Sequence, residues 1–154
     1  PDRVPLVRGG ELVSSLVSPR SAAEYGVPTN GATAAETPCS IDLGCGRLPT
    51  DDALARLGTG LYVSNLWYCN FSDRSACRTT GMTRFATFWV QNGELIEPVS
   101  VMRFDETIYR MLGENLIDLT AERELIMAAD TYESRSVQSA RLPGALIDDF
   151  TLTL

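Results

Sequence analysis

The clearest alternation of hydrophobic and polar residues lies in one stretch, which reads TRFATFWVQNGELIEPVSV from Thr83 to Val101. Two runs rich in β-forming residues flank Asn92-Gly93, a dipeptide typical of the two-residue type I′ turn, in which both central residues need a positive φ. The pattern predicts an antiparallel β-hairpin that folds at this dipeptide.

A turn at Asn92-Gly93 also predicts the register of the hairpin, since a two-residue turn leaves no freedom in the pairing. Pro98 cannot donate a backbone hydrogen bond, so a β-bulge or a sheet edge is expected there. The expected pairs place Gln91 opposite Glu94, Val90 opposite Leu95, Phe88 opposite Glu97 and Thr87 opposite Pro98.

Helical signals are shorter and fewer. Ser18-Pro19 is a typical N-cap and first helical residue, and Gly26 is a typical stop, which predicts a helix over 19–25. A second short helix is expected over 51–57, ending at Gly58. One medium helix is expected over 105–119, from the helical spacing of Ile108, Met111, Leu112, Leu116 and Leu119.

The remaining segments read as strands and turns. Gly9-Gly10 is a hairpin signal. Residues 61–69 read as one strand, and 70–81 as a polar loop. Shorter strands are expected over 40–43, 125–128 and 150–154. Taken together, the predicted helices, strands and turns indicate a single α+β domain over 1–154 that is mainly antiparallel β, with a barrel-like or sandwich-like sheet.

Charge limits the function. The net charge of −7 argues against nucleic-acid and anionic-membrane partners, because both need clustered cations. The chain has no histidine, which removes the commonest general base and metal ligand. It starts at Pro1 without a signal-peptide pattern, so we expect a processed chain or a fragment of a longer protein.

The four cysteines, Cys39, Cys45, Cys69 and Cys77, lack the spacing of zinc knuckles. We expect reduced, mostly structural thiols in a cytoplasmic protein. A thiol-redox role would need Cys69 and Cys77 within bridging range, with nearby arginines to lower a thiol pKa.

A second candidate site is the predicted loop at 70–81 and the residues just before it. Its polar and aromatic side chains could contact a peptide, with arginine available for bidentate carboxylate binding. The candidate peptide contacts are Asn65, Tyr68, Asn70, Arg74 and Arg78; an ordinary solvated loop is the alternative. No catalytic residue is assigned to this chain.

The order of several motifs resembles the C-terminal domain of the TldD/PmbA (TldE) family, the metalloprotease-like peptide-processing proteins once called modulators of DNA gyrase. The most specific block is Phe88 to Glu94 (FWVQNGE), followed by Pro98-Val99. Weaker matches lie, in the family's order, at Pro5-Leu6-Val7, Glu11-Leu12, Ser21-Ala22, Thr29-Asn30-Gly31-Ala32, Gly60-Leu61-Tyr62-Val63 and from Pro143 onward.

The resemblance implies a peptide substrate and a homo- or heterodimer with a family member. Active members carry an HExxxH metal helix upstream of this domain and a cysteine ligand near its end; the matching region here, 128–143, has no cysteine. No metal or cofactor is therefore expected in this chain, although a partner subunit could hold zinc. We expect a non-metal domain that helps to form a substrate chamber. The alternative is a stand-alone peptide- or ligand-binding domain.

Overall fold

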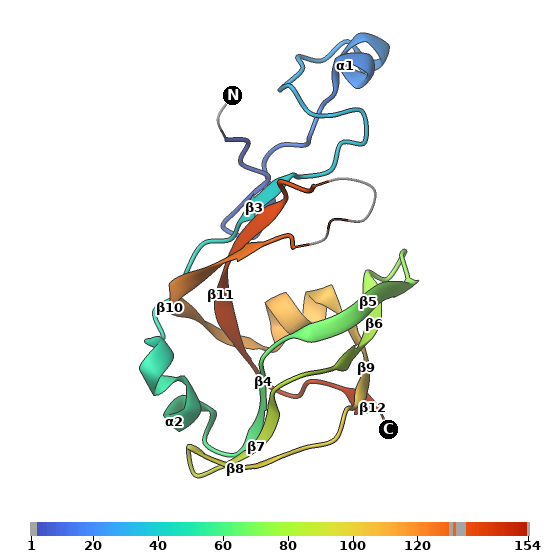
Figure 1. The fold of residues 1–154 in the computed structure, drawn as a ribbon. Helices are drawn as coiled ribbons and strands as arrows, with labels where there is room; N and C mark the ends of the chain where they lie inside the picture. The colour runs from blue at the N-terminus through green and yellow to red at the C-terminus, as the bar shows by residue number, and fades with distance from the viewer. Residues whose placement is uncertain (1–2, 130, 132–134, 154) are drawn as a thin grey trace. The chain divides into compact units, whose positions relative to one another are not determined.

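The structure is a computed structural model that describes residues 3–129, 131 and 135–153 (Figure 1). The chain divides into two compact units. The first holds residues 1–42 and 125–141, and the second holds residues 43–124 and 142–154. The long strands β10 (Leu116–Met127) and β11 (Ser139–Ile147) contribute to both.

The first unit begins with a small hairpin. Strands β1 (Val7–Arg8) and β2 (Glu11–Leu12) pair antiparallel, and Gly9 and Gly10 both have positive φ, which confirms the predicted turn. Later in this unit, β3 (Ser40–Asp42) pairs with the start of β11 in a parallel register.

Helix α1 (Pro19–Tyr25) has the predicted bounds. The Ser18 hydroxyl accepts a hydrogen bond from the backbone N–H of Ser21, and Gly26 ends the helix in the left-handed conformation. The helix therefore forms where both of its capping signals are local.

The second unit contains a three-stranded sheet in the order β4-β7-β8. Its strands are β4 (Gly60–Val63), β7 (Thr87–Gln91) and β8 (Glu94–Pro98). The short helices η1 (Thr50–Asp52) and α2 (Ala53–Leu57) precede it, as predicted, and end at Gly58.

The β7–β8 hairpin confirms the predicted turn, since Asn92 and Gly93 have φ values of 53° and 81°. Gln91 lies opposite Glu94 and Val90 opposite Leu95, as expected. The register then shifts, so that Trp89 pairs with Glu97 and Phe88 with Pro98. The expected pairing of Phe88 with Glu97 is wrong by one residue, because the bulge lies nearer the turn than Pro98. Pro98 instead ends β8, an edge strand.

A four-stranded sheet completes the second unit, in the order β12-β9-β6-β5. All its pairings are antiparallel. Its strands are β12 (Leu152–Thr153), β9 (Arg103–Thr107), β6 (Arg78–Thr83) and β5 (Leu66–Asp73). The mainly antiparallel α+β prediction is confirmed, and in the described part of the chain the sheets do not close into a barrel.

The predicted strand over 61–69 and loop over 70–81 are wrong in detail. The first is split at Ser64-Asn65 between β4 and β5, which belong to different sheets. The second is most of a hairpin, formed by the end of β5, a turn at 74–77 and β6. Polar side chains at 70–81 can form strands because this hairpin carries much of its polarity on an exposed face.

The predicted medium helix over 105–119 is also wrong. Residues 105–107 belong to β9, residues 110–114 form the π-helical segment η2 (Arg110–Glu114), and β10 begins at Leu116. Pairing of Asp105 with Thr80 and of Glu106 with Thr79 fixes the first part as strand. Tertiary pairing therefore outweighs the helical spacing of the apolar residues.

The core is small and partly polar. Among the described residues the buried hydrophobic side chains are Leu48, Val90, Phe104 and Leu146. Ser18, Thr83, Thr87, Glu106 and Thr120 are also buried. No helix in the described part of the chain is both long and apolar enough to cross a bilayer.

Candidate functional site

The four-stranded sheet has one buried face and one open face. Along β9, Phe104 and Glu106 are buried, while Arg103, Asp105 and Thr107 are not. Since residues directly opposite across a sheet share a face, the pairing partners of these residues complete each face. We call the open side the outer face; its members include Trp67, Asn70, Arg78, Thr80, Met82, Arg103 and Asp105.

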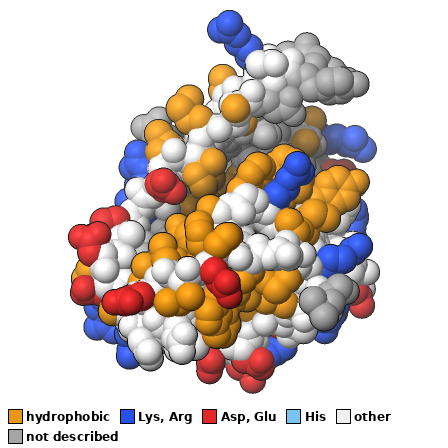
Figure 2. Space-filling view, turned by 60° about the horizontal axis from the view of Figure 1, so that its bottom comes forward, with side chains coloured by type: hydrophobic (Ala, Val, Ile, Leu, Met, Phe, Trp, Pro, Cys, Tyr) orange, Lys and Arg blue, Asp and Glu red, His pale blue; other side chains and the backbone are white. Residues whose placement is uncertain are grey.

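Three aligned positions define one end of the outer face. Trp67 on β5 lies opposite Met82 on β6, and Met82 lies opposite Arg103 on β9. Trp67 is 44% exposed, so part of its indole is open to a partner. Figure 2 shows hydrophobic side chains in a broad band across one face of the molecule, with arginine side chains beside it.

An aromatic–arginine cluster, formed by Trp67, Arg84 and Phe85, adjoins this end. The two rings meet edge to face, with centroids 5.9 Å apart. The Arg84 guanidinium carbon lies 5.4 Å from the Trp67 ring centre and 5.3 Å from that of Phe85. Both distances allow cation–π attraction, so the rings hold the guanidinium in place.

Two of the non-glycine residues with a positive φ lie at the same place. Phe85 has φ 63° and Tyr68 has φ 54°, and both side chains are largely exposed. The left-handed conformation costs a bulky residue about 1–2 kcal/mol. Tyr68 lies where the β5–β6 register shifts, between the pairs at Trp67 and Asn70. Such strain at exposed aromatic residues is typical of functional surfaces.

The predicted peptide-contact residues lie along the β5–β6 hairpin but do not form one cluster. Asn70 and Arg78 lie on the outer face. Asn65 precedes β5, Tyr68 lies at the bulge, and Arg74 lies in the turn.

Arg78 is engaged within the chain, since its guanidinium lies 3.4 Å from the Asp105 carboxylate. Sequence reasoning missed Trp67, Arg84 and Phe85, which are brought together only by strand pairing across the bulge. The signal that was available is Arg84-Phe85, a cation and an aromatic residue where β6 ends.

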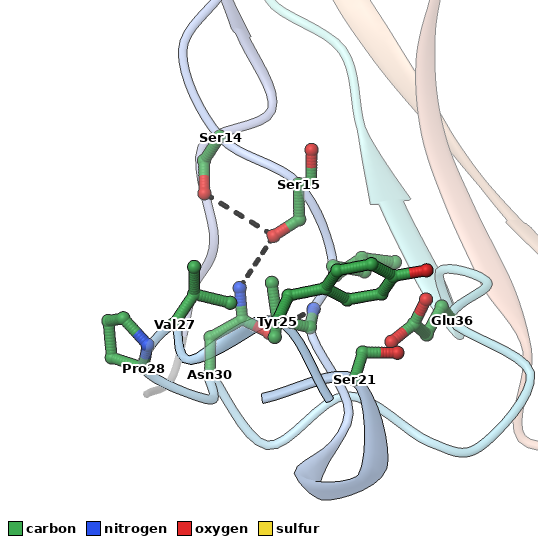
Figure 3. A pocket seen from close by; sticks show the side chains of 10 residues that line it. Ser14, Ser15, Ser21, Tyr25, Val27, Pro28, Asn30 and Glu36 are labelled. Atoms are coloured by element: carbon green, nitrogen blue, oxygen red, sulfur yellow. Dashed lines mark hydrogen bonds between the residues drawn. The ribbon is translucent and has the colours of Figure 1, made fainter. Parts of the chain in front are cut away.

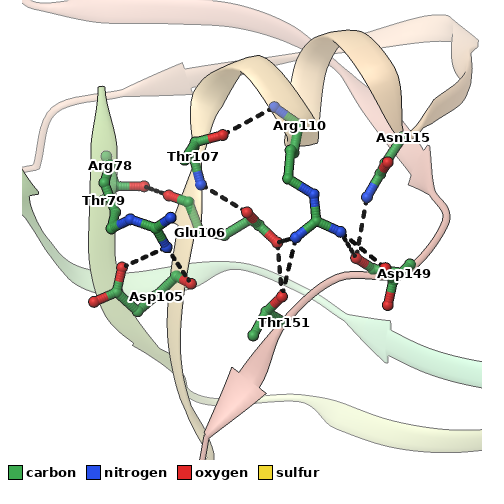
Figure 4. Close-up of polar contacts among 9 residues, drawn as sticks. All are labelled: Arg78, Thr79, Asp105, Glu106, Thr107, Arg110, Asn115, Asp149 and Thr151. Carbon is green, nitrogen blue, oxygen red and sulfur yellow. Dashed lines mark hydrogen bonds and ion pairs between the residues drawn. The ribbon is translucent and has the colours of Figure 1, made fainter. Parts of the chain in front are cut away.

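A buried polar network supports the sheet from its inner side (Figure 4). The Glu106 carboxylate is 2% exposed and accepts hydrogen bonds from the Thr107 N–H and the Thr151 hydroxyl, each at 2.8 Å. Arg110 donates to the same carboxylate at 2.9 Å and to Asp149 at 2.8 Å. The network ties the chain around β12 to β9 and η2.

The charge state of Glu106 follows from these contacts. Burial raises the pKa of its carboxyl, but hydrogen bonds from Thr107 and Thr151 and the charge of Arg110 outweigh burial, so the pKa lies below its ordinary value. Glu106 is therefore an ionised structural group with all its partners inside the chain, and we assign it no catalytic role.

The cysteines are not the buried thiols expected from the sequence. Cys39, Cys45 and Cys69 are exposed, Cys77 is half-buried, and all four are free. Partial burial raises the pKa of the Cys69 thiol, which opposes the thiolate that a redox role needs. The Cys77 sulfur lies 3.6 Å from the Tyr109 hydroxyl and raises the pKa of that tyrosine.

The first unit contains an open pocket of about 470 Å³ (Figure 3). Its lining includes Ser21, Tyr25, Asn30 and Glu36. The Asn30 side chain stabilises one wall of the pocket. Its amide NH₂ donates to the Ser15 carbonyl at 2.7 Å, and its amide oxygen accepts from the Val17 N–H at 2.9 Å. These polar groups therefore serve the local fold.

Glu36 is likewise engaged in the fold. Hydrogen bonds from Ser21 and Ser18 lower the pKa of its carboxyl. Elsewhere, over residues 3–129, 131 and 135–153, no group of three or more histidine, cysteine, aspartate or glutamate side chains is placed to hold a metal ion.

Solved structures of other proteins share the fold, and two of them illustrate it. One is a proposed modulator of a DNA gyrase from Thermotoga maritima, with 15% identity and a TM-score of 0.75. The other is TldE from Thermococcus kodakarensis, with 14% identity and a TM-score of 0.75. Each match covers 96% of this chain but only 32% and 33% of the respective solved chains, so this chain spans about a third of their length.

The comparison with curated proteins gives no match. A family model, described as the PmbA/TldA metallopeptidase C-terminal domain, matches residues 1–154. The resemblance drawn from FWVQNGE and the ordered weaker motifs is thereby confirmed. By this match over its whole length, the chain belongs to the PmbA/TldA metallopeptidase C-terminal domain family.

Proposed function

We propose that this chain is the non-metal C-terminal domain of a TldE/PmbA-like peptide-processing protein, and that its outer face forms part of the wall that peptides contact. Family membership supports the link to peptide processing. The absence of histidine from the sequence supports a role without a metal of its own.

The observation that carries the proposal is the position of β5. It is the last strand in the order β12-β9-β6-β5, and all eight of its residues are exposed. An exposed edge strand presents unpaired backbone groups, and an extended peptide can pair with them whatever its sequence. Trp67, Tyr68 and Phe71 offer apolar contact beside that edge.

The proposed assembly is a dimer with a family member that supplies the metal, in the cytoplasm. The large apolar side chains that the second unit leaves exposed support the proposed assembly, because a partner subunit could cover them. On the second unit these include Trp67, Phe71, Phe85, Leu95, Ile96 and Val101.

Peptide binding tests the proposal directly. Fluorescence anisotropy of a labelled, unstructured peptide should rise on titration with the chain. A Trp67→Ala variant, which removes the aromatic ring from the outer face, should bind about tenfold more weakly, equal to 1.4 kcal/mol. The matched control is Tyr25→Ala, which removes an exposed aromatic ring from the first unit. Equal loss in both variants, or no binding by the unaltered chain, would contradict the proposal.

Metal analysis and peptide hydrolysis distinguish a partner subunit from a stand-alone binding domain. We expect the intact parent protein to cleave a labelled peptide only when mixed with a metal-bearing family member. Stoichiometric zinc in the parent alone would show that the non-metal assignment is wrong. Peptide binding without any effect on a metal-bearing partner would favour the stand-alone domain.

A further inference from the structure

Arg84 is a fixed cation without an anion. Its guanidinium rests against the rings of Trp67 and Phe85, at 5.4 and 5.3 Å from the ring centres. Over the described residues, no ion pair involves Arg84, although the side chain is exposed. The Arg84 guanidinium is thus held on the surface with its N–H donors available to bind an anion.

Arg103 adds a second cation on the same side of the sheet. It lies opposite Met82, which lies opposite Trp67, so two strand spacings of about 4.8 Å separate Arg103 from the indole. Arg103 is exposed and, in the described part of the chain, also makes no ion pair. The nearest outer-face carboxylate on its strand, Asp105, is paired with Arg78.

This local charge is opposite to that of the whole chain. The sequence has a net charge of −7 and no lysine, yet two unpaired arginines flank an exposed tryptophan here. Arginine matches carboxylate geometry with two parallel hydrogen bonds, and it lies flat on aromatic rings. Because the rings already restrict Arg84, binding an anion costs little further side-chain entropy.

We propose that Trp67, Arg84, Phe85 and Arg103 form a recognition site for the carboxylate side chains of an acidic peptide. The inference rests on the proposed function, because it names the class of peptide that the outer face prefers. Arg84 takes a glutamate or aspartate side chain, and Arg103 takes a second acidic residue or strengthens the local field. Trp67 covers the aliphatic part of the bound segment.

Nucleic acid is the competing anionic partner, because aromatic and arginine side chains also stack on bases. Proteins that bind single-stranded nucleic acid do so in grooves where many cationic side chains follow the phosphate backbone. At this site the two arginines beside Trp67 lie on a strongly acidic chain, which favours a peptide with one or two carboxylates.

The test compares two labelled peptides that differ only in charge, one with glutamate at alternate positions and one with glutamine there. We expect the glutamate peptide to bind the chain about tenfold more tightly, or 1.4 kcal/mol. That preference should shrink as salt rises from about 50 to 300 mM, because exposed charges are screened. Arg84→Gln should abolish it, and Arg103→Gln should reduce it about threefold.

Arg84→Lys keeps the charge but loses the planar, two-pronged donor, so it should retain part of the preference. The matched control is Arg20→Gln, an exposed arginine of α1 that makes no ion pair with the described residues. It should leave both affinities unchanged. Thermal melting of each variant checks that it is folded. If Arg84→Gln does not fold, Arg103→Gln still tests the preference for the glutamate peptide.

The outcomes separate the inference from the proposed function. Equal binding of both peptides, unaffected by Arg84→Gln, would overturn the acidic preference but leave peptide contact standing. No binding of either peptide would overturn both. Tighter binding of a single-stranded oligonucleotide than of the glutamate peptide, with the same dependence on Arg84, would overturn the choice of a peptide.

Discussion

Replacing Glu106 with glutamine tests whether the buried network holds the second unit together. The carboxylate accepts hydrogen bonds from Thr107, Arg110 and Thr151 at 2.8–2.9 Å and is 2% exposed. Glutamine has the same size, but its NH₂ group is a donor. Wherever that group points, it meets another donor, and Arg110 loses its buried counter-charge.

The expected cost lies between two reference values. A hydrogen bond to a charged group contributes about 1.5–3 kcal/mol, and removing one partner of a fully buried ion pair costs about 3–5 kcal/mol. Because the Arg110 side chain is 34% exposed, water compensates part of the loss. We therefore expect Glu106→Gln to lower the free energy of unfolding by about 2–3 kcal/mol. The melting temperature should fall by about 5–10 °C.

The matched control changes the other carboxylate that Arg110 contacts. Asp149 lies 2.8 Å from the same guanidinium, but its side chain is 80% exposed. Asp149→Asn should cost at most about 1 kcal/mol, and asparagine tolerates the φ of 50° found there. Urea denaturation followed by far-UV circular dichroism at neutral pH measures both variants. Equal costs, or a cost below about 1 kcal/mol for Glu106→Gln, would refute the reasoning.

The unaltered chain and the Glu106→Gln variant should also differ in how their stability depends on pH. The folded-state pKa of Glu106 is lowered, so ionised Glu106 adds stability that is fully present above the unfolded pKa of about 4.3. This stability is lost as the pH falls through the folded pKa. The stability advantage of the unaltered chain over Glu106→Gln should therefore narrow below about pH 4. An advantage that grows on acidification would contradict the assignment.

Three further predictions concern single sites. Gly93→Ala should destabilise the chain by about 1–2 kcal/mol in thermal melting, because φ is 81° and the new Cβ would lie 3.1 Å from the Ala55 Cα; an unchanged melting temperature would contradict the type I′ turn. Thr87→Val should be neutral or stabilise by up to about 1 kcal/mol in urea denaturation, because the buried hydroxyl lacks a hydrogen-bond partner among the described residues; a large loss would reveal a missed partner. Cys69 should react with maleimide more slowly at neutral pH than the cysteine of a short unstructured peptide, since its pKa is raised; faster reaction would contradict that direction.

Elements with their own end signals could be predicted from the sequence. Helix α1 has a serine cap, a proline at its first position and a left-handed Gly26, all within nine residues of sequence from Ser18 to Gly26. The β7–β8 turn likewise needs only Asn92-Gly93. Such signals involve only residues that are close in sequence, so packing against distant segments seldom overrides them.

Elements that depend on pairing with distant segments could not be predicted from the sequence. The spacing of Ile108, Met111, Leu112, Leu116 and Leu119 fits a helix, but β9 is held by pairing with β6 and β10 by its place beside β11. Glu106 illustrates the same point. In sequence it is one acid among many, and only the fold places it between Thr107, Arg110 and Thr151.

The candidate site divides in the same way. The sequence pointed to Tyr68, Asn70 and Arg78 as contacts in a polar loop, where the structure has the β5–β6 hairpin, and their contact with a peptide stays a prediction. It could not show that Arg84 folds back over Trp67, because a residue inserted near Tyr68 changes which side chains meet.

Hydrogen exchange with and without saturating peptide tests the central claim, which is that the outer face and its edge strand contact peptides. The account predicts slower exchange of the amides in β5 (Leu66–Asp73) and around Arg84 when peptide is bound. Exchange in α1 (Pro19–Tyr25) should be unchanged. Protection confined to α1 and the pocket beside it, with none in β5, would contradict the account.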